Sequence, residues 1–267
     1  MLTADIDMTG EDWTPIGDTN DGYTGTFDGN GHKISNLVCE RTGDKQVSGL
    51  FAQLKENSVV RNLGMEDGMF TSSTSTAGAV AAKSNLGKVI NCWNSGKVTA
   101  HDYAGGIVGS SQGWIESCKN SGAIKATWGY GRSGGIAGEQ VCDRNSSQQY
   151  VRTYIKYCYN TGTADAYYAG GITGYQSYKN REACDIISCW SDAAMTGSIP
   201  GGIAGSLARG DTIQNCVFNT DRFKGGVYNN NKNGSVKDSE GMTSAEFASG
   251  KAAWVLNGKD NSLVSQA

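Results

Sequence analysis

Short apolar runs recur along the chain at a nearly constant spacing, and glycine brackets most of them. The clearest copy is Gly105-Gly106-Ile107-Val108-Gly109. The central apolar residue of this run recurs, in steps of 30, 27, 29, 36 and 31 residues, at Leu50, Val80, Ile107, Ile136, Ile172 and Ile203. Self-similarity at a period of about 20 to 50 residues is the signature of a solenoid, propeller or array. We therefore expect one elongated repeat domain.

Two more columns of apolar residues keep this period. One column places Leu or Cys three residues after Ile or Val, at Leu37, Leu63, Cys92, Cys118, Cys158, Cys189 and Cys216. The other follows six or seven residues later, at Phe70, Val98, Ile124, Ala164, Met195 and Phe223. Each repeat thus holds three strand-like runs, none with a helical period. Strands that pair with their copies in the next coil, about 4.8 Å away, predict an all-β parallel β-solenoid of about seven coils.

The repeat stops near residue 240, and helix signals follow it. Thr243 and Glu246 have the spacing of a capping box, and Phe247 and Trp254 supply apolar positions after it. We therefore predict repeats over residues 1–240, and a short capping helix with a tail over 241–267. The helix is expected to cover the exposed end of the last coil and to protect its unpaired strand edges.

The composition narrows the choice of partners. The formal net charge is −3 and no basic run is present, so we expect no nucleic-acid partner. No apolar run approaches the roughly 18 residues that span a bilayer, so we expect no membrane insertion. The first residues lack the pattern of a signal peptide, and we expect the chain to adjoin further domains of a longer polypeptide.

Five cysteines form one column of the repeat, at Cys92, Cys118, Cys158, Cys189 and Cys216. The paired spacing and histidine partners of a zinc site are absent, so we predict small apolar core residues, no metal and no cofactor. Cys142 and Cys184 lie instead in extra sequence that lengthens the same turn of two successive coils. We predict a disulfide between them, which presupposes an oxidising compartment.

The repeats GGIVGSSQGWIESCKNSGAI and GGIAGSLARGDTIQNCVFNT resemble those of GLUG-motif proteins. The opening segments LTADIDMTGEDWTPIG and GTFDGNGHKISNL, and the closing TSAEFASGKAAWVLNG, are similar to segments that flank such arrays. The resemblance implies a right-handed parallel β-helix from a secreted or wall-attached bacterial protein. Such proteins are commonly adhesin-like, or lie beside IgA-cleaving metallopeptidases. The resemblance supplies no catalytic motif.

Catalytic chemistry has few candidates in this chain. The two histidines, His32 and His101, do not begin an HExxH sequence, and no nucleophile motif accompanies them. The enzymatic alternative is cleavage of a polysaccharide by carboxyl groups on neighbouring coils, at spacings that glycoside hydrolysis requires. The main candidate acids are Asp102, Glu139 and Asp165, and Asp143, Glu182 and Asp185 are further candidates. They do not share one repeat position, and a scattered acidic surface explains them equally well.

Aromatic residues are the most informative surface feature. Ten of the twelve tyrosines lie between Tyr103 and Tyr178. The position after the cysteine column, which should point outward, holds Trp93, Lys119, Tyr159, Trp190 and Val217. A turn before the glycine run carries a second aromatic group, Trp128, Tyr130, Tyr167 and Tyr168. Exposed rings can stack on sugars or anchor proteins, and the alternative is that they pack on one another for stability.

These observations favour a non-catalytic extracellular module of a larger surface or secreted protein. We expect it to bind a glycan or a host surface protein, or to act as a spacer. The alternative is a carbohydrate-active enzyme, either a lyase or a glycoside hydrolase, on the same scaffold.

Overall fold

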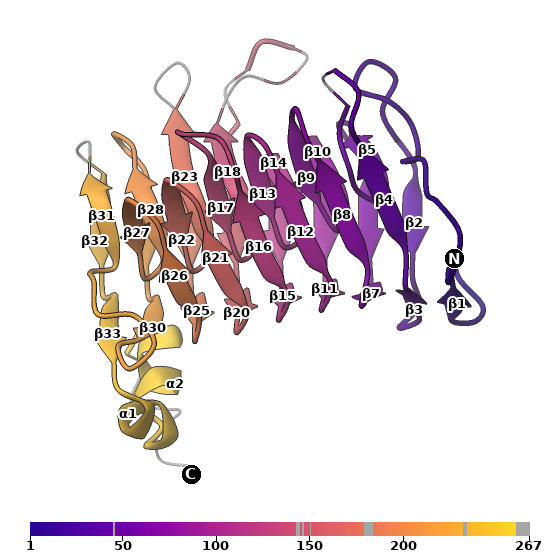
Figure 1. The fold of residues 1–267 in the computed structure, drawn as a ribbon. Helices are drawn as coiled ribbons and strands as arrows, with labels where there is room; N and C mark the ends of the chain where they lie inside the picture. The colour runs from indigo at the N-terminus through magenta and orange to yellow at the C-terminus, as the bar shows by residue number, and fades with distance from the viewer. Residues whose placement is uncertain are drawn as a thin grey trace.

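The computed structural model describes residues 1–44, 46–142, 145, 147–149, 151–178, 184–231 and 234–259. The chain winds into an all-β parallel solenoid of about seven turns, with two short helices near its C-terminus (Figure 1). The fold predicted from the repeat is therefore confirmed.

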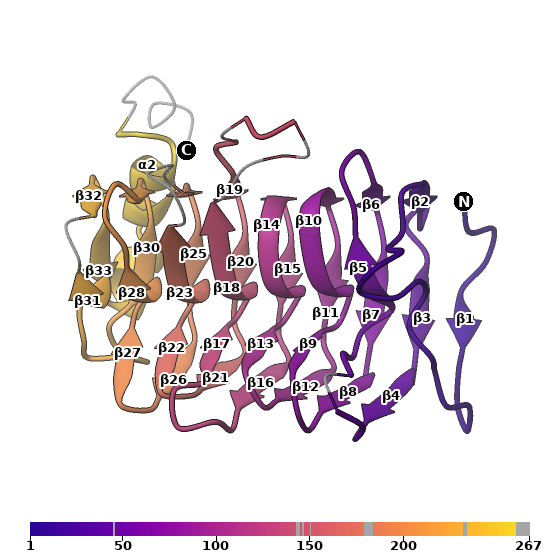
Figure 2. The same cartoon turned by 90° about the horizontal axis from the view of Figure 1, so that it is seen from above.

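The strands form four sheets that run along the solenoid (Figure 2). The nine-stranded sheet contains β1 (Ile6–Asp7), β3 (Lys33–Ser35), β7 (Gly64–Glu66), β11 (Trp93–Asn94), β15 (Lys119–Asn120), β20 (Tyr159–Asn160), β25 (Trp190–Ser191), β30 (Val217–Asn219) and β33 (Glu240–Met242). The thirteen-stranded sheet contains β2 (Thr26–Asp28), β5 (Phe51–Leu54), β6 (Val59–Arg61), β10 (Ala81–Ile90), β14 (Val108–Glu116), β18 (Ala137–Cys142), β19 (Tyr154–Lys156), β23 (Thr173–Tyr178), β24 (Asp185–Ile187), β28 (Ala204–Leu207), β29 (Thr212–Gln214), β31 (Tyr228–Asn231) and β32 (Ser235–Lys237). The six-stranded sheet contains β4 (Val38–Arg41), β8 (Met69–Ser72), β12 (Lys97–Ala100), β16 (Ala123–Ala126), β21 (Thr163–Asp165) and β26 (Ala194–Thr196). The five-stranded sheet contains β9 (Thr76–Gly78), β13 (Tyr103–Gly105), β17 (Arg132–Gly134), β22 (Tyr168–Gly170) and β27 (Ile199–Gly201).

The five-stranded sheet corrects the expectation of three strands per coil. Its strands precede the glycine run, and they turn only small side chains inward, such as Ala104 and Ser133, both fully buried. A strand without a large apolar residue cannot be predicted from the periodicity of hydrophobic residues. The small residues are sterically required, because a Cβ added at Gly105 would lie 1.9 Å from the carbonyl oxygen of Val108.

The corner between the thirteen-stranded and nine-stranded sheets uses one left-handed residue per coil. From the second coil onward these residues, with φ between 48° and 56°, are Asn62, Asn91, Ser117, Tyr157, Ser188, Asn215 and Asp238. Asn36 lies instead between β3 and β4, so Leu37 does not share the repeat position of Leu63 and Cys92. Asn and Asp tolerate this conformation far better than other side chains that carry a Cβ. The residue that directly follows each of these corner residues, from Asn62 to Asn215, points into the core. The cysteine column, which includes Cys92 and Cys118, occupies this position.

The predicted core columns are buried. Leu50, Ile107 and Ile115 have at most 1% of their surface exposed, and so do the cysteines of the column. The third column holds as far as Met195, but its expected last member, Phe223, lies outside the strands and is only partly buried. It packs on Phe218 with ring centres 6.1 Å apart.

The C-terminal segment differs from the expectation of one helix across the last coil. The predicted capping box is present, since Thr243 accepts a hydrogen bond from the backbone of Glu246 and that side chain accepts one from Thr243. Two helices follow, α1 (Ser244–Ala248) and α2 (Lys251–Leu256), separated at Gly250 with φ 82°. They cover an outer face of the solenoid rather than its end, as the next subsection describes. Neither described helix is long and apolar enough to cross a membrane.

Candidate functional site

A groove runs along the outer surface where the five-stranded sheet meets the first half of the thirteen-stranded sheet. Its volume is about 510 Å³. Residues of β13 and β17 form one wall, and β10, β14, β18 and β23 form the floor. The floor residues follow one another in register from Lys83 through Ser110 and Glu139 to Tyr175. Because successive strands lie about 4.8 Å apart, these side chains form a regular line parallel to the solenoid axis.

Arg132 and Glu139 form an ion pair in the middle of this groove. The Arg132 guanidinium carbon lies 4.8 Å from the ring centre of Tyr103 and 4.2 Å from that of Tyr175. The Glu139 side chain is only 10% exposed, and it also accepts a hydrogen bond of 3.1 Å from Ser177 Oγ. The pair is thus held between two rings, where partial desolvation strengthens the cation–π contacts.

The groove brings together two of the three proposed catalytic acids. Asp102 lies on its wall and accepts a hydrogen bond of 2.6 Å from Nδ1 of the adjacent His101. Between Asp102 and Glu139, burial and the Glu139 charge raise the pKa of Tyr103, and the Asp102 charge adds to the effect. Tyr103 therefore stays a neutral hydrogen-bonding phenol at physiological pH.

The third acid, Asp165, does not belong to the groove. It lies on β21 of the six-stranded sheet, 2.9 Å from Lys125 Nζ and 2.9 Å from Thr196 Oγ1. Burial raises the pKa of Asp165, but the hydrogen bonds from Lys125 and Thr196 outweigh it and leave the pKa below the ordinary value. Asp185 pairs with Arg152 at 2.7 Å, and Asp143 and Glu182 lie outside the described residues.

Aromatic rings continue from the groove across the neighbouring turn. We name this chain of contacts the aromatic arc, with each ring centre 4.9 to 6.2 Å from the next, in the order His101, Trp128, Tyr130, Tyr167, Tyr168 and Tyr175. Trp128 is 43% exposed and Tyr130 is 58% exposed. Most neighbouring rings are tilted or perpendicular rather than parallel, and Trp128 and Tyr130 are the rings of the arc that expose most surface to solvent.

The row on the nine-stranded sheet is packed differently. Tyr159 and Trp190 stack with ring centres 4.7 Å apart and planes 4° apart. Lys119 Nζ lies 5.6 Å from the ring centre of Trp93, whose indole lies against Gly64. These rings stack along the row on their neighbours, so their faces are largely unavailable to a ligand.

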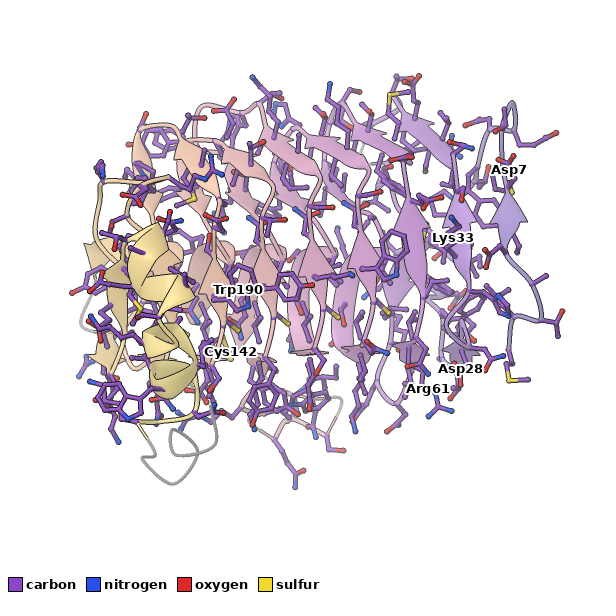
Figure 3. All side chains as sticks on the ribbon, turned by 90° about the horizontal axis from the view of Figure 1, so that it is seen from below. Asp7, Asp28, Lys33, Arg61, Cys142 and Trp190 are labelled. Atoms are coloured by element: carbon purple, nitrogen blue, oxygen red, sulfur yellow. A yellow bond between two sulfur atoms is a disulfide. The ribbon has the colours of Figure 1, made fainter. Side chains whose placement is uncertain are left out.

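The two helices cover the C-terminal end of this row (Figure 3). Phe247 of α1 lies 6.1 Å from Trp190, between ring centres. Val255 of α2 packs on Val217, the next member of the row, which is fully buried although strand alternation predicts that it points outward. The helices therefore extend the apolar packing of an outer face.

The structure joins Cys142 and Cys184 in a disulfide, with Cα atoms 5.7 Å apart. Both residues are buried, and the backbone N–H of Cys184 donates a hydrogen bond of 2.9 Å to Asp211. Val141 and Ser177, which line the groove, lie on the strands that lead into this bridge. The bridge thus anchors one end of the groove floor.

The sequence did not identify several groove residues as site residues, chiefly Arg132, Tyr103, Tyr175 and Lys83. Arg132 and Tyr103 occupy equivalent outward positions on the five-stranded sheet, in register with Tyr168. Recognition of that strand would have placed them on one surface. The described residues contain no group of three or more His, Cys, Asp or Glu arranged to hold a metal ion.

No family model matches the chain. "Halomucin" of Haloquadratum walsbyi is 35% identical over 123 residues, which is 42% of this chain and 1% of that protein. A "Putative Gly-rich membrane protein" of Evansella cellulosilytica is 42% identical over 64 residues, or 24% of this chain and 7% of that protein. The chain therefore spans only a small part of either relative.

A solved structure from Bacteroides ovatus, described as a "putative immunoglobulin A1 protease", superposes with a TM-score of 0.76. The match covers 95% of this chain and 80% of that chain at 24% identity. The two chains share the β-solenoid fold. The likeness to GLUG-motif proteins rests on the repeats and the flanking segments of the sequence alone.

Proposed function

We propose that this solenoid is an extracellular recognition module that binds a glycan in the groove and on the aromatic arc without cleaving it. The observation that carries the proposal is the Arg132–Glu139 pair, which is held between Tyr103 and Tyr175 at one end of the arc. Guanidinium, carboxylate and phenol groups can hydrogen-bond sugar hydroxyls, while the exposed rings of Trp128 and Tyr130 can stack on sugar faces.

The same geometry argues against cleavage. An acid catalyst must be protonated and a nucleophile must be free to attack, but Glu139 is engaged by Arg132 and Ser177. Asp102 shares the groove and keeps the glycosidase alternative open to test, whereas Asp165 lies on a different sheet.

An extracellular position agrees with two features. A disulfide persists in oxidising compartments, and Cys142 and Cys184 are placed to form one. The names of the similar proteins, halomucin, a Gly-rich membrane protein and an immunoglobulin A1 protease, point to the cell surface or to secretion.

The test is a glycan array, followed by titration of the purified chain with each neutral glycan that binds. Replacement of Tyr130, whose ring is largely exposed, by Ala should weaken binding at least about 10-fold, the equivalent of about 1.4 kcal/mol. Met69→Ala is the control, because Met69 is an exposed apolar residue of the six-stranded sheet and lies outside the groove and the arc. It should leave the affinity for the neutral glycan unchanged.

Mass spectrometry of the same samples separates the alternatives. Intact glycan after incubation supports recognition, and cleaved products that disappear in Glu139→Gln would replace it with catalysis. If no glycan binds, the spacer role gains support. If Tyr130→Ala binds as well as the unaltered chain, the aromatic arc is not part of the recognition site.

A further inference from the structure

Tyr157 occupies a backbone conformation that suits its side chain poorly. It is the corner residue of its coil, with φ 56°, where the other coils place Asn, Ser or Asp. A bulky residue in the left-handed region is an outlier, and such strain persists where the side chain serves a purpose. The ring does not fill the core, because Tyr157 is 50% exposed.

One lysine lies beside Tyr157, and the two preceding coils each carry a lysine within three residues of their own corner residue. Lys156 Nζ lies 4.6 Å from the ring centre of Tyr157. Lys88 lies over Trp114 and Lys119 over Trp93, each with Nζ 5.6 Å from a ring centre. We name Lys88, Lys119, Lys156 and Tyr157 the basic corner.

The basic corner carries an excess of positive charge. No carboxylate among the described residues lies within ion-pair distance of its three lysines. Two acids share rows with these lysines. Glu116 is in register with Lys156 and is hydrogen-bonded at 3.3 Å by Tyr154. Asp185, in the row of Lys88, is paired with Arg152. Since the whole chain has a net charge of −3, this local surplus of cations is opposite in sign to the rest of the molecule.

We infer that the basic corner binds an anionic polysaccharide, with its sulfate or carboxylate groups on the lysines and a sugar ring against Tyr157. Lys88 and Lys156 lie at different repeat positions of the thirteen-stranded sheet, and Lys119 lies on the nine-stranded sheet. They therefore spread positive charge over the corner of three successive coils, which complements the negative charge of such a polymer. The exposed aromatic ring favours a sugar over a purely electrostatic partner. This site lies at the far edge of the thirteen-stranded sheet from the groove and is independent of glycan binding there.

The experiment uses dextran sulfate as the probe and uncharged dextran as its control, with binding measured at 50 and 300 mM NaCl. Dextran sulfate should bind at the lower salt concentration and at least about 10-fold more weakly at the higher one, because salt screens exposed charges. Tyr157→Asn restores the residue type preferred at this corner, so it should raise the melting temperature and still lower the affinity at least about 5-fold.

The double variant Lys119→Gln, Lys156→Gln should lower the affinity further. Lys97→Gln is the matched control, since Lys97 is an exposed lysine of the six-stranded sheet, and it should have no effect. Unchanged affinity in Tyr157→Asn would overturn the inference, as would an equal loss in Lys97→Gln. Equal binding of polyglutamate would assign the corner to acidic polypeptides instead. A failure to bind dextran sulfate at 50 mM NaCl would overturn the proposed site altogether. Tyr130→Ala should bind dextran sulfate normally, which keeps this site separate from the groove.

Discussion

The rings of Tyr159 and Trp190 lie face to face on adjacent strands, 4.7 Å apart between centres and 4° from parallel. Phe247 of α1 packs on Trp190, with ring centres 6.1 Å apart. The pair therefore links the solenoid wall to the C-terminal helices.

Trp190→Ala should lower the free energy of unfolding by about 2 to 3 kcal/mol, because it removes a large, partly buried ring and the contact with α1. Combined with Tyr159→Ala, it should give a coupling energy of about 0.5 to 1.5 kcal/mol in a double-mutant cycle. Denaturant unfolding measures both quantities. Strictly additive effects would mean that the stack contributes nothing beyond the area that each ring buries.

Substitutions of the corner residues should change the free energy of unfolding in a predictable direction. Tyr157→Asn should raise the free energy of unfolding by about 1 kcal/mol, because Asn adopts the left-handed region with less strain. Ser117→Asn, at the same corner one coil earlier, should also be stabilising. Tyr154→Asn is the control, since Tyr154 lies within strand β19, and it should destabilise the chain. Thermal unfolding of the three variants checks the order.

The cysteine column is also a column of hydrogen bonds. The backbone N–H of Cys118 donates to Cys158 Sγ at 3.3 Å, and Ser239 Oγ plays the same role for Cys216 at 2.9 Å. Cys158→Ala should therefore cost about 1 to 3 kcal/mol of stability, because a buried N–H loses its partner. Cys158→Ser keeps an acceptor and should cost less. Equal losses in the two variants would show that the volume of the sulfur matters and that its hydrogen bond does not.

Thiol titration separates the two classes of cysteine. Burial raises the pKa of Cys92, Cys118, Cys158 and Cys189 well above the usual value, so the native chain should not react with Ellman's reagent at pH 8. After denaturation without reductant, six of the eight cysteines should react, since Cys142 and Cys184 are paired. Eight reactive thiols would contradict the disulfide.

Asp211 should make stability depend on pH near neutrality. Burial raises the pKa of Asp211 to about 7, against hydrogen bonds from the backbone of Cys184 and Ala208 that favour the charged form. Because the folded-state pKa is above the unfolded value, this group stabilises the fold most below pH 4, and the stability is lost as the pH rises toward 7. The expected slope is at most about 1.4 kcal/mol per pH unit.

Melting temperatures from pH 5.5 to 8 measure this dependence, with Asp211→Asn as the reference. Asn cannot titrate, so the difference between the two proteins isolates Asp211 from every other ionisable group of the chain. The Asp185–Arg152 pair, whose charges act on Asp211, is retained in both proteins. Parallel curves would mean that Asp211 keeps one charge state across this range.

Much of the architecture follows from sequence alone, because every coil buries the same positions. Ile107 and its equivalents, and the column that includes Cys118, identify the strands, their stacking and the inward direction. The capping box at Thr243 was recognisable because capping depends on residues three positions apart. The extra sequence around Cys142 and Cys184 indicated their pairing because equivalent turns of successive coils lie side by side.

Only the tertiary structure decided which outer faces of the sheets meet to form the groove. The bends at Gly105 and at Ser117 set the angles between sheets, and hydrophobic periodicity carries no information about those angles. Asp102 and Glu139 therefore share a groove while Asp165 lies on another sheet, although all three lie within a few residues of the same repeat motif. The position of α2 on Val217 likewise depends on an apolar outer face that strand alternation predicts to be exposed. Local patterns report what each coil buries, whereas the site depends on how the coil bends.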